Sequence, residues 1–354
     1  MHLTMKLHRM QLPREVILGN ETIELVYDIC KKLGFSQSVF MVMGRRTRHI
    51  LGQRIIDLLD DVGMDTDYTT VDSSTMKNVE LVEEKLFELK PQVVLGVGGG
   101  TNIDVAKLSS ARQNTPFISI PTTASHDGIA GPLASVKGLG KPYSEMAQAP
   151  MAIIADTSII SQAPHRFTAS GCGDAISKLT AVRDWKLANN TRNEYYGEYA
   201  ASLALMSAKL VAKNAHIMKN KTEEGVRVLL EALISCGVAM SIAGSSRPCS
   251  GSEHLFSHAL DVIMSKPSLH GEQTGIGTIM MAYLHKMNWK RIKETLRRVG
   301  APTTAAELSI EPKYIVEALV RAHAIRPGRY TILEEKRLDY DSAEKLAKVT
   351  GIIE

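Results

Sequence analysis

The sequence has few aromatic residues and little net charge. Only 5% of its 354 residues are Phe, Trp or Tyr, and the formal net charge is +4. Proteins that bind nucleic acid usually carry a concentrated basic surface, often with aromatic residues on which bases stack. No basic run interleaved with aromatic residues occurs here, so we expect a small-molecule substrate and no nucleic acid. The mild positive charge would help to attract a phosphorylated substrate.

Cysteine and long apolar runs are also scarce. The four cysteines (Cys30, Cys172, Cys236 and Cys249) lie far apart and form no CxxC pair, which is typical of a reduced compartment and argues against a disulfide framework. The N-terminal stretch MHLTMKLHRMQLPREV lacks the apolar core of a signal peptide. No uninterrupted apolar segment is long enough to span a bilayer. We therefore predict a cytoplasmic protein without membrane insertion.

What is present is enough apolar material for a large core, in two different patterns. Hydrophobic residues make up 44% and charged residues 23% of the chain, as in ordinary soluble proteins. In the first half, helical periodicity alternates with apolar runs that fit buried parallel strands; from about residue 161 helical periodicity dominates. We predict an α/β dinucleotide-binding domain with a parallel, Rossmann-like sheet over residues 1–160 and an all-α domain over residues 161–354. The expected strands lie at residues 13–18, 39–43, 93–95, 117–120 and 152–155.

The most informative stretch is PQVVLGVGGGTNIDVAK, residues 91–107. Its strand runs into Gly96–Gly100, a turn with four glycines in five residues. A helix follows, with Thr101 or Asn102 as its expected cap and Asp104 in its first turn. Bare backbone N–H groups and the positive end of a helix bind phosphate, and glycines let the ligand approach closely. The alternative is a tight turn without a ligand, but the number of glycines favours phosphate binding.

A second strand end bears on the choice between NADH and NADPH. The strand at 39–43 meets Gly44 and then Arg45 and Arg46. An acidic residue at this place favours NAD by binding the ribose 2′-hydroxyl, whereas arginine accepts a 2′-phosphate. NADPH use is therefore plausible. The alternative is a pair of arginines on a solvated loop.

A third strand end carries hydroxyl groups. The strand at 117–120 ends in PTTASHDG, and ligands of open α/β sheets bind at such strand ends. The hydroxyls of Thr122, Thr123 and Ser125 can hold the nicotinamide side of a cofactor. A loop that is merely rich in serine and threonine is the alternative.

Histidine and aspartate residues gather in three pieces of the helical half. These are SGCGDAISK at residues 170–178, GSEHLFSH at 251–258 and PSLHGEQ at 267–273. His254 and His258 are four residues apart and share one helix face, so spacing alone predicts that both bind a metal ion. The alternative for each histidine is a local hydrogen bond or helix cap. Several candidate ligands in so short a stretch favour a metal site.

Taken together, these motifs resemble those of one enzyme superfamily. GGGTNIDVAK is similar to the GGG-S/T-x-x-D-x-AK motif of the iron-containing alcohol dehydrogenases and dehydroquinate synthases, which cradles a nicotinamide dinucleotide pyrophosphate. PTTASHDG, GCGDAISK, SGSEHLFSHALD and LHGEQ are similar to motifs of its archaeal-type glycerol-1-phosphate dehydrogenases. The resemblance covers about residues 96–275 and implies a dehydroquinate synthase-like fold. Residues 276–354 carry no such motif.

The resemblance implies roles for the metal and substrate residues. It implies that Asp174, His254 and His270 bind one divalent metal ion, and that His258 faces the substrate instead of the metal. One carboxylate and two imidazoles leave zinc an open position, as catalytic sites do, and iron accepts the same ligands. Asp127 and His258 become the candidates for proton relay or for binding a substrate hydroxyl. Asp174 is expected to contact the substrate as well.

The resemblance also implies which residues bind NADH or NADPH. Gly131 stands where the family often has a serine, so that a side-chain contact is lost or replaced by backbone. The expected cofactor residues are Gly98, Gly99, Gly100, Thr101, Thr122, Thr123, Ala124, Ser125 and Gly131.

The implied activity is NAD(P)H-dependent, metal-assisted reduction of dihydroxyacetone phosphate to sn-glycerol 1-phosphate, the backbone of archaeal membrane phospholipids. A homo-oligomer is expected. One alternative is a glycerol dehydrogenase of the same superfamily, which acts on an unphosphorylated substrate. A dehydroquinate synthase-like lyase is a further alternative, but it would need more basic side chains than the motifs supply.

A substrate phosphate needs cations or convergent hydrogen-bond donors. The segment GSSRPCSGS, residues 244–252, supplies such donors just before His254. We predict that Arg247 binds the phosphate, assisted by Ser250 or Ser252. The alternative is that Arg247 forms a structural ion pair and that the serines only cap the following helix.

Overall fold

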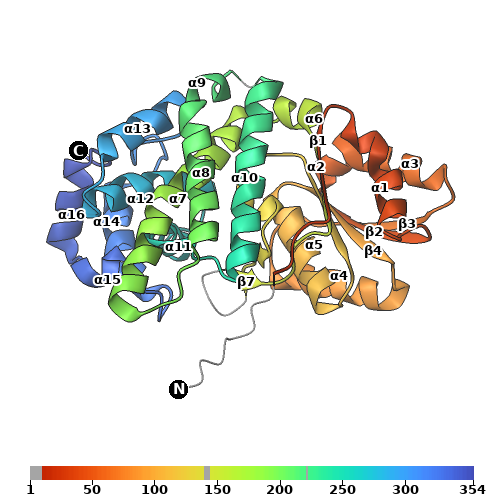
Figure 1. The fold of residues 1–354 in the computed structure, drawn as a ribbon, viewed down its shortest axis with the longest axis horizontal. Coiled ribbons are helices and arrows are strands. Elements are labelled where there is room, and N and C mark those ends of the chain that lie inside the picture. Colours follow the sequence, from red (N-terminus) through yellow and green to blue (C-terminus); the bar gives the residue numbers. More distant parts are fainter. Residues whose placement is uncertain (1–9, 139–143, 221) are drawn as a thin grey trace.

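The computed structural model describes residues 10–138, 144–220 and 222–354. Residues 1–9 lie outside the described residues. They are part of the N-terminal stretch in which we expect no signal peptide. Figure 1 shows a sheet with its helices on the right and an all-helical half on the left. This arrangement confirms the predicted fold class.

Six parallel strands form the main sheet in the order β1-β8-β5-β4-β2-β3. The chain moves outward from β2 to β3 and then returns to place β4 on the other side of β2. The strand order therefore reverses between β2 and β4, where open parallel sheets bind their ligands. The strands are β1 (Glu15–Gly19), β2 (Ser38–Met43), β3 (Asp65–Thr70), β4 (Val93–Gly98), β5 (Phe117–Pro121) and β8 (Ala152–Asp156), with a small antiparallel pair of β6 (Leu133–Ala134) and β7 (Glu145–Met146).

Both faces of the sheet are buried, which explains why its central strands are continuous apolar runs. In β2 the side chains of Phe40 and Val42 join one hydrophobic cluster, and those of Met41 and Met43 join another on the opposite face. Helices of the first half cover both faces. They are α1 (Val26–Lys32), α2 (Arg45–Thr47), α3 (Gln53–Asp60), α4 (Met76–Leu89), α5 (Gly100–Arg112) and α6 (Thr157–Gln162), with short segments η1 (Thr22–Leu25), η2 (Arg48–Gly52) and η3 (Asp127–Ile129).

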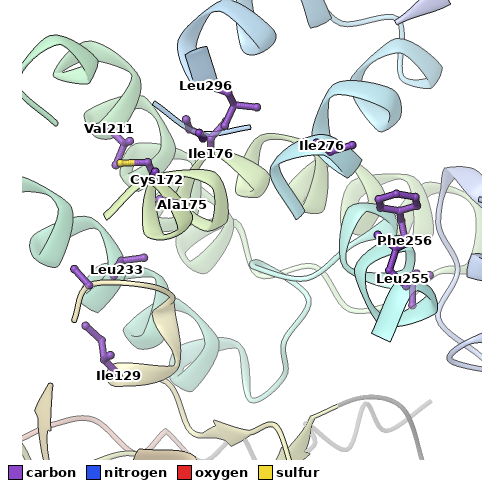
Figure 2. Close-up of a cluster of buried hydrophobic side chains, with 14 of the residues drawn as sticks. Ile129, Cys172, Ala175, Ile176, Val211, Leu233, Leu255, Phe256, Ile276 and Leu296 are labelled. Atoms are coloured by element: carbon purple, nitrogen blue, oxygen red, sulfur yellow. The ribbon is translucent and has the colours of Figure 1, made fainter. Parts of the chain in front are cut away.

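Beyond β8 the described chain forms helices and no strand, as the periodicity from residue 161 predicts. The division into two domains remains a prediction, because one hydrophobic cluster runs from β2 and β4 into these helices. Figure 2 shows part of that cluster, where Cys172 and Ile176 of the first long helix pack near Val211 and Leu296. The helices are α7 (His165–Arg192), α8 (Glu198–Lys213), α9 (Ala215–Met218), α10 (Glu223–Ala243), α11 (Ser252–Ile263), α12 (His270–Leu284), α13 (Trp289–Arg298), α14 (Pro312–Arg321), η4 (Ala322–Ala324), α15 (Ile332–Lys336) and α16 (Tyr340–Val349).

Helix α10 differs from the expectation that no segment is apolar enough to span a bilayer. It has 21 residues and a window of mean hydropathy 1.8, which passes that test by length and composition. However, 67% of this window is buried inside the protein, where α10 packs against α7 and α8. Its apolar surface is thus used in the core of the helical half. The four cysteines are free and buried.

Candidate active site

One cavity of about 880 Å³ lies where the carboxyl ends of the strands meet the helical half. On the sheet side, Arg46 follows β2, Gly99 follows β4 and Thr122 follows β5. On the helical side, α11 contributes His254 and α12 contributes His270. The cavity therefore joins the expected cofactor strand ends to the expected metal ligands.

The glycine turn keeps the backbone at the start of α5 free of side chains, because neighbouring side chains already lie where a Cβ would be. Gly98 has a φ of +147°, and a Cβ at that position would lie 2.2 Å from Asn102 Oδ1. A Cβ at Gly100 would lie 1.9 Å from His126 Nε2, so no side chain fits at either position. Gly99, Gly100 and Thr101 line the cavity. Backbone N–H groups at a helix start, approached without side chains, fit a pyrophosphate.

The predicted cap of this helix was wrong. Gly99 is the N-cap and α5 begins at Gly100, without a side-chain cap hydrogen bond. Asn102 lies inside the first turn, and its Nδ2 donates to Val71 O at 3.3 Å. Asp104 follows in the next turn. The first N–H groups of α5 are therefore left without a side-chain cap, which suits an anionic ligand.

Asp104 and Lys107 of the same motif have a role that the sequence did not reveal. Lys107 is fully buried, and its Nζ donates to Gly128 O at 2.6 Å and to Leu133 O at 2.7 Å. Burial lowers the pKa of Lys107, and the nearby carboxylate of Asp104 opposes that effect. Asp104 Oδ2 accepts from Ser135 N at 3.1 Å. These two side chains hold the segment after β5 against α5.

The hydroxyl residues after β5 lie at the cavity, as expected. Thr122, Thr123 and Ser125 line it, whereas Ala124 is buried in the hydrophobic cluster. Gly131 is not among the lining residues either, and a Cβ there would lie 2.6 Å from Met240 Cε. Met240, which does line the cavity, thus fills the space that a serine at position 131 would occupy.

Asp174, His254 and His270 come together from three helices. Their ligand atoms all lie within 4.8 Å of one another. His254 Nε2 is 3.6 Å and His270 Nε2 is 4.0 Å from Asp174 Oδ1. The structure therefore places the three residues that the resemblance implies as metal ligands around a single point.

The surroundings of the two histidines fit a metal ion. His254 Nδ1 lies 2.8 Å from Glu253 Oε1, and His270 Nδ1 lies 3.4 Å from Ser257 Oγ. Glu253 is itself held by Gly251 N at 2.7 Å and by Thr180 Oγ1 at 2.7 Å. A histidine that is held through one ring nitrogen presents the other one to a metal. Both rings thus present Nε2 toward Asp174.

Lys178 compensates the negative charge at this point. It is fully buried, with Nζ 2.6 Å from Asp174 Oδ1 and 2.8 Å from Asp127 Oδ2. The contact between Lys178 and Asp127 is an ion pair and not a hydrogen bond, since Asp127 Oδ2 accepts no hydrogen bond from the described residues. Asp127 N donates to Asp174 Oδ2 at 2.8 Å. Lys178 therefore couples the expected substrate residue to the expected metal ligand.

The protonation states of Asp174 and His270 also suit metal binding. For His254, burial lowers the pKa, but the contacts with Asp174 and Glu253 outweigh that effect and raise it. Burial alone would raise the pKa of Asp174, but the charge of Lys178 and the contacts with His254 and His270 hold it well below its usual range. Burial, together with the charge of His254, lowers the pKa of His270 well below its usual range. An ionised carboxylate and a neutral imidazole are the forms that bind metal.

His258 lies beside this group. Its ring centroid is 6.4 Å from that of His254 and 6.0 Å from that of His270. Its Nδ1 lies 3.7 Å from Asp261 Oδ2, and the residue lines the cavity. This position favours the substrate role that the resemblance implies over the ligand pair that helical spacing suggested.

Arg247 is placed differently from the prediction. Its guanidinium forms an ion pair with Glu194 and donates to Tyr330 O at 2.8 Å, and the residue is 4% exposed and absent from the cavity wall. Ser252 is similarly engaged, because its N and Oγ both bind Asp184 Oδ2. These contacts favour the structural ion pair for Arg247. Arg326, in the segment where the sequence showed no motif, lines the cavity instead.

Comparison with known proteins shows the family of this chain. A family model described as iron-containing alcohol dehydrogenase matches residues 17–164. A protein of Pyrococcus furiosus named glycerol-1-phosphate dehydrogenase [NAD(P)+] is 55% identical over 347 residues, which cover 98% of this chain and 100% of that one. A protein of the same name from Methanosarcina mazei is 54% identical over 97% of this chain and 96% of its own.

Solved structures share the fold at lower identity. Glycerol dehydrogenase from Schizosaccharomyces pombe matches with a TM-score of 0.81 at 20% identity, over 98% of this chain and 91% of that one. Butanol dehydrogenase A from Thermotoga maritima matches with a TM-score of 0.75 at 18% identity, over 97% and 100% of the two chains. The identity to the curated relatives over nearly the whole chain decides the family. The chain belongs to the glycerol-1-phosphate dehydrogenases, within the iron-containing alcohol dehydrogenases.

Proposed function

We propose that this chain catalyses the NAD(P)H-dependent, metal-assisted reduction of dihydroxyacetone phosphate to sn-glycerol 1-phosphate, for archaeal membrane phospholipid synthesis. The observation that carries this proposal is the 55% identity to a relative named glycerol-1-phosphate dehydrogenase [NAD(P)+] over nearly the full length. The convergence of Asp174 with His254 and His270, the two histidines that line the cavity, supports it. A glycerol dehydrogenase is less favoured, because the match to one is a fold match at 20% identity.

The reaction needs two groups that the chain would hold. Asp174, His254 and His270 would hold a divalent cation, which would supply carbonyl polarisation, and the residues after β4 and β5 would hold a reduced nicotinamide, which would supply the hydride. We propose zinc as the cation, since two imidazoles, one carboxylate and an open position are typical of catalytic zinc.

The chain itself positions the reactants. The start of α5, with Gly99, Gly100 and Thr101, binds the pyrophosphate through backbone N–H groups. Thr122 and Thr123 orient the nicotinamide with their hydroxyls.

Asp127 and His258 handle the substrate hydroxyl and the proton. Asp127 is ion-paired with Lys178 at 2.8 Å and lines the cavity, so its carboxylate accepts a hydrogen bond from a substrate hydroxyl. His258 lines the same cavity, with Asp261 near its Nδ1. Its Nε2 is therefore the ring atom that passes a proton between solvent and the product oxygen.

Other properties follow as proposals from the family. We propose that both NADH and NADPH are used. The relatives carry NAD(P)+ in their names, and Arg46 lines the cavity after β2, where it can accept a 2′-phosphate. We also propose that the enzyme is cytoplasmic and acts as a homo-oligomer.

The experiment is a cofactor oxidation assay at 340 nm with purified, zinc-loaded protein. NADPH and NADH are each combined with dihydroxyacetone phosphate, with dihydroxyacetone and with no substrate. We expect a catalytic efficiency for dihydroxyacetone phosphate far above that for dihydroxyacetone. Asp174→Ala is the matched control, because it should remove both bound metal and activity. Preference for the unphosphorylated ketone would overturn the proposal in favour of a glycerol dehydrogenase.

A further inference from the structure

Arg326 lies at the cavity on the side of the helical half. It follows η4, which packs against α11, the helix that carries His254 and His258. Arg326 is half-buried and lines the cavity with Ser246 and Ser250. Its Nη1 donates to Ser246 Oγ at 3.2 Å. A guanidinium therefore forms part of the wall of the cavity that His254 and His258 also line.

Arg329 supports this wall from behind. It is 6% exposed, and its Nη2 donates to Ser246 Oγ at 2.8 Å while Nη1 donates to Ser250 O at 2.6 Å. Burial, together with the positive charges of Arg326 and Arg247, lowers the pKa of Arg329 to about 9. Since like charges repel, three guanidiniums gathered around one loop favour the binding of an anion among them.

The three arginines are not equivalent. Arg247 lies outside the cavity wall and is paired with Glu194. Arg329 is turned toward the loop at residues 246–250. Arg326 alone of these three lines the cavity. A planar guanidinium binds two oxygens of a phosphate at once, which an uncharged triol or ketone cannot exploit.

We propose that Arg326, backed by Arg329 through Ser246, binds the phosphate of dihydroxyacetone phosphate and selects it over the unphosphorylated ketone. This inference rests on the proposed function, since it assigns the phosphate end of that substrate. The cofactor phosphates are a second source of the same chemistry, but their expected place is the glycine turn after β4, on the sheet side of the cavity. Arg326 comes from the helical side, next to α11.

The test compares Arg326→Ala, Arg326→Lys and Arg321→Ala with the unmodified enzyme. Arg321 is a matched control, because it lies in α14 on the exposed surface and pairs with Glu317 at 2.6 Å. KM and kcat are measured for dihydroxyacetone phosphate, dihydroxyacetone, NADPH and NADH. The shift of Tm on adding inorganic phosphate is measured for each protein, which gives a readout that needs no turnover.

We expect Arg326→Ala to raise the KM for dihydroxyacetone phosphate about 10- to 150-fold, the range for losing a charged hydrogen bond. The catalytic efficiency with dihydroxyacetone and the KM for both cofactors should stay within about twofold, and the stabilisation by inorganic phosphate should shrink. Arg326→Lys should recover part of the loss, because it keeps the charge without the fork. Arg321→Ala should behave as the unmodified enzyme.

Three results for Arg326→Ala would overturn the inference alone. Equal losses on both ketones would mean that Arg326 supports the fold. A rise confined to the KM for NADPH would mean that it binds the cofactor. Unchanged kinetics with full turnover of dihydroxyacetone phosphate would refute the role of Arg326 and leave the proposed function standing. If the unmodified enzyme does not turn over dihydroxyacetone phosphate, the proposed function itself fails, and the inference with it.

Discussion

Lys178 offers the sharpest test of how the metal site is held. Its ammonium group lies 2.6 Å from Asp174 Oδ1 and 2.8 Å from Asp127 Oδ2, with the side chains of Lys178 and Asp174 at 0% exposure. Lys178→Met keeps the volume of the side chain and removes the charge. We expect the variant to fold less stably and to bind metal only at higher pH.

The magnitude follows from the burial. Removing one partner of a buried ion pair costs about 3–5 kcal/mol, because the remaining charge is left in the interior without compensation. Here the variant leaves the carboxylates of Asp174 and Asp127 facing each other, so we expect a loss of this size in the free energy of unfolding of the metal-free protein. Bound zinc should restore much of it, since it supplies positive charge at the same point.

Zinc binding to the Lys178→Met variant should need a higher pH than zinc binding to the unmodified protein. Lys178 holds the pKa of Asp174 well below its usual range, against the effect of burial. Without Lys178 that pKa rises. Because metal binding needs the ionised carboxylate, the acidic limb of zinc binding should move to higher pH in the variant.

The assay combines urea unfolding of metal-free and zinc-loaded protein with zinc binding measured from pH 4 to 8. Lys107→Met is the matched control, since Lys107 is another fully buried lysine, paired with Asp104 at 3.5 Å. It should also lose stability, but its zinc binding should keep the pH dependence of the unmodified protein. A Lys178→Met protein with unchanged stability and an unchanged acidic limb would refute the reasoning.

Two further predictions concern the ligands and the glycine turn. His270→Ala should lose bound metal, whereas His258→Ala should keep some, because losing a side chain that does not itself bind the metal costs roughly 10–100-fold in metal affinity. Metal analysis showing the reverse would favour the His254–His258 ligand pair that helical spacing suggested. Gly100→Val should raise the cofactor Kd strongly with metal retained, because a Cβ there would lie 1.9 Å from His126 Nε2. Fluorescence titration with NADH checks this prediction, and an affinity equal to that of the unmodified protein would contradict a phosphate role for the turn.

The sequence predicted the sheet well where both faces are buried. The runs at 39–43, 93–95 and 117–120 became β2, β4 and β5, because continuous apolar residues leave few alternatives to a covered parallel strand. β3, with the sequence DTDYTT, was missed. It is an edge strand, and none of its six residues is buried. Its polar composition therefore resembles that of a loop.

The candidate site was predictable only as far as its motifs reach. The segments with Asp174, His254 and His270 carry local signatures, and the structure brings these residues together. The phosphate side was not predictable, because it depends on contacts between distant segments. The place of Arg247 near His254 suggested a phosphate role, yet Arg247 pairs with Glu194, and Arg326 lies in a stretch without a motif.

Helix α7 has a consequence for the order in which the protein is made. It brings Asp174, Lys178 and Thr180 out of the ribosome well before His254 and His270, which lie on α11 and α12. At about 5–20 residues per second, the nascent chain therefore passes several seconds with Asp174 but with neither of the two expected histidine ligands. During that time Lys178 can neutralise Asp174 without any metal. A metal ion bound by all three residues would therefore be held only after α12 has begun to emerge, when residues 1–160 have long been synthesised.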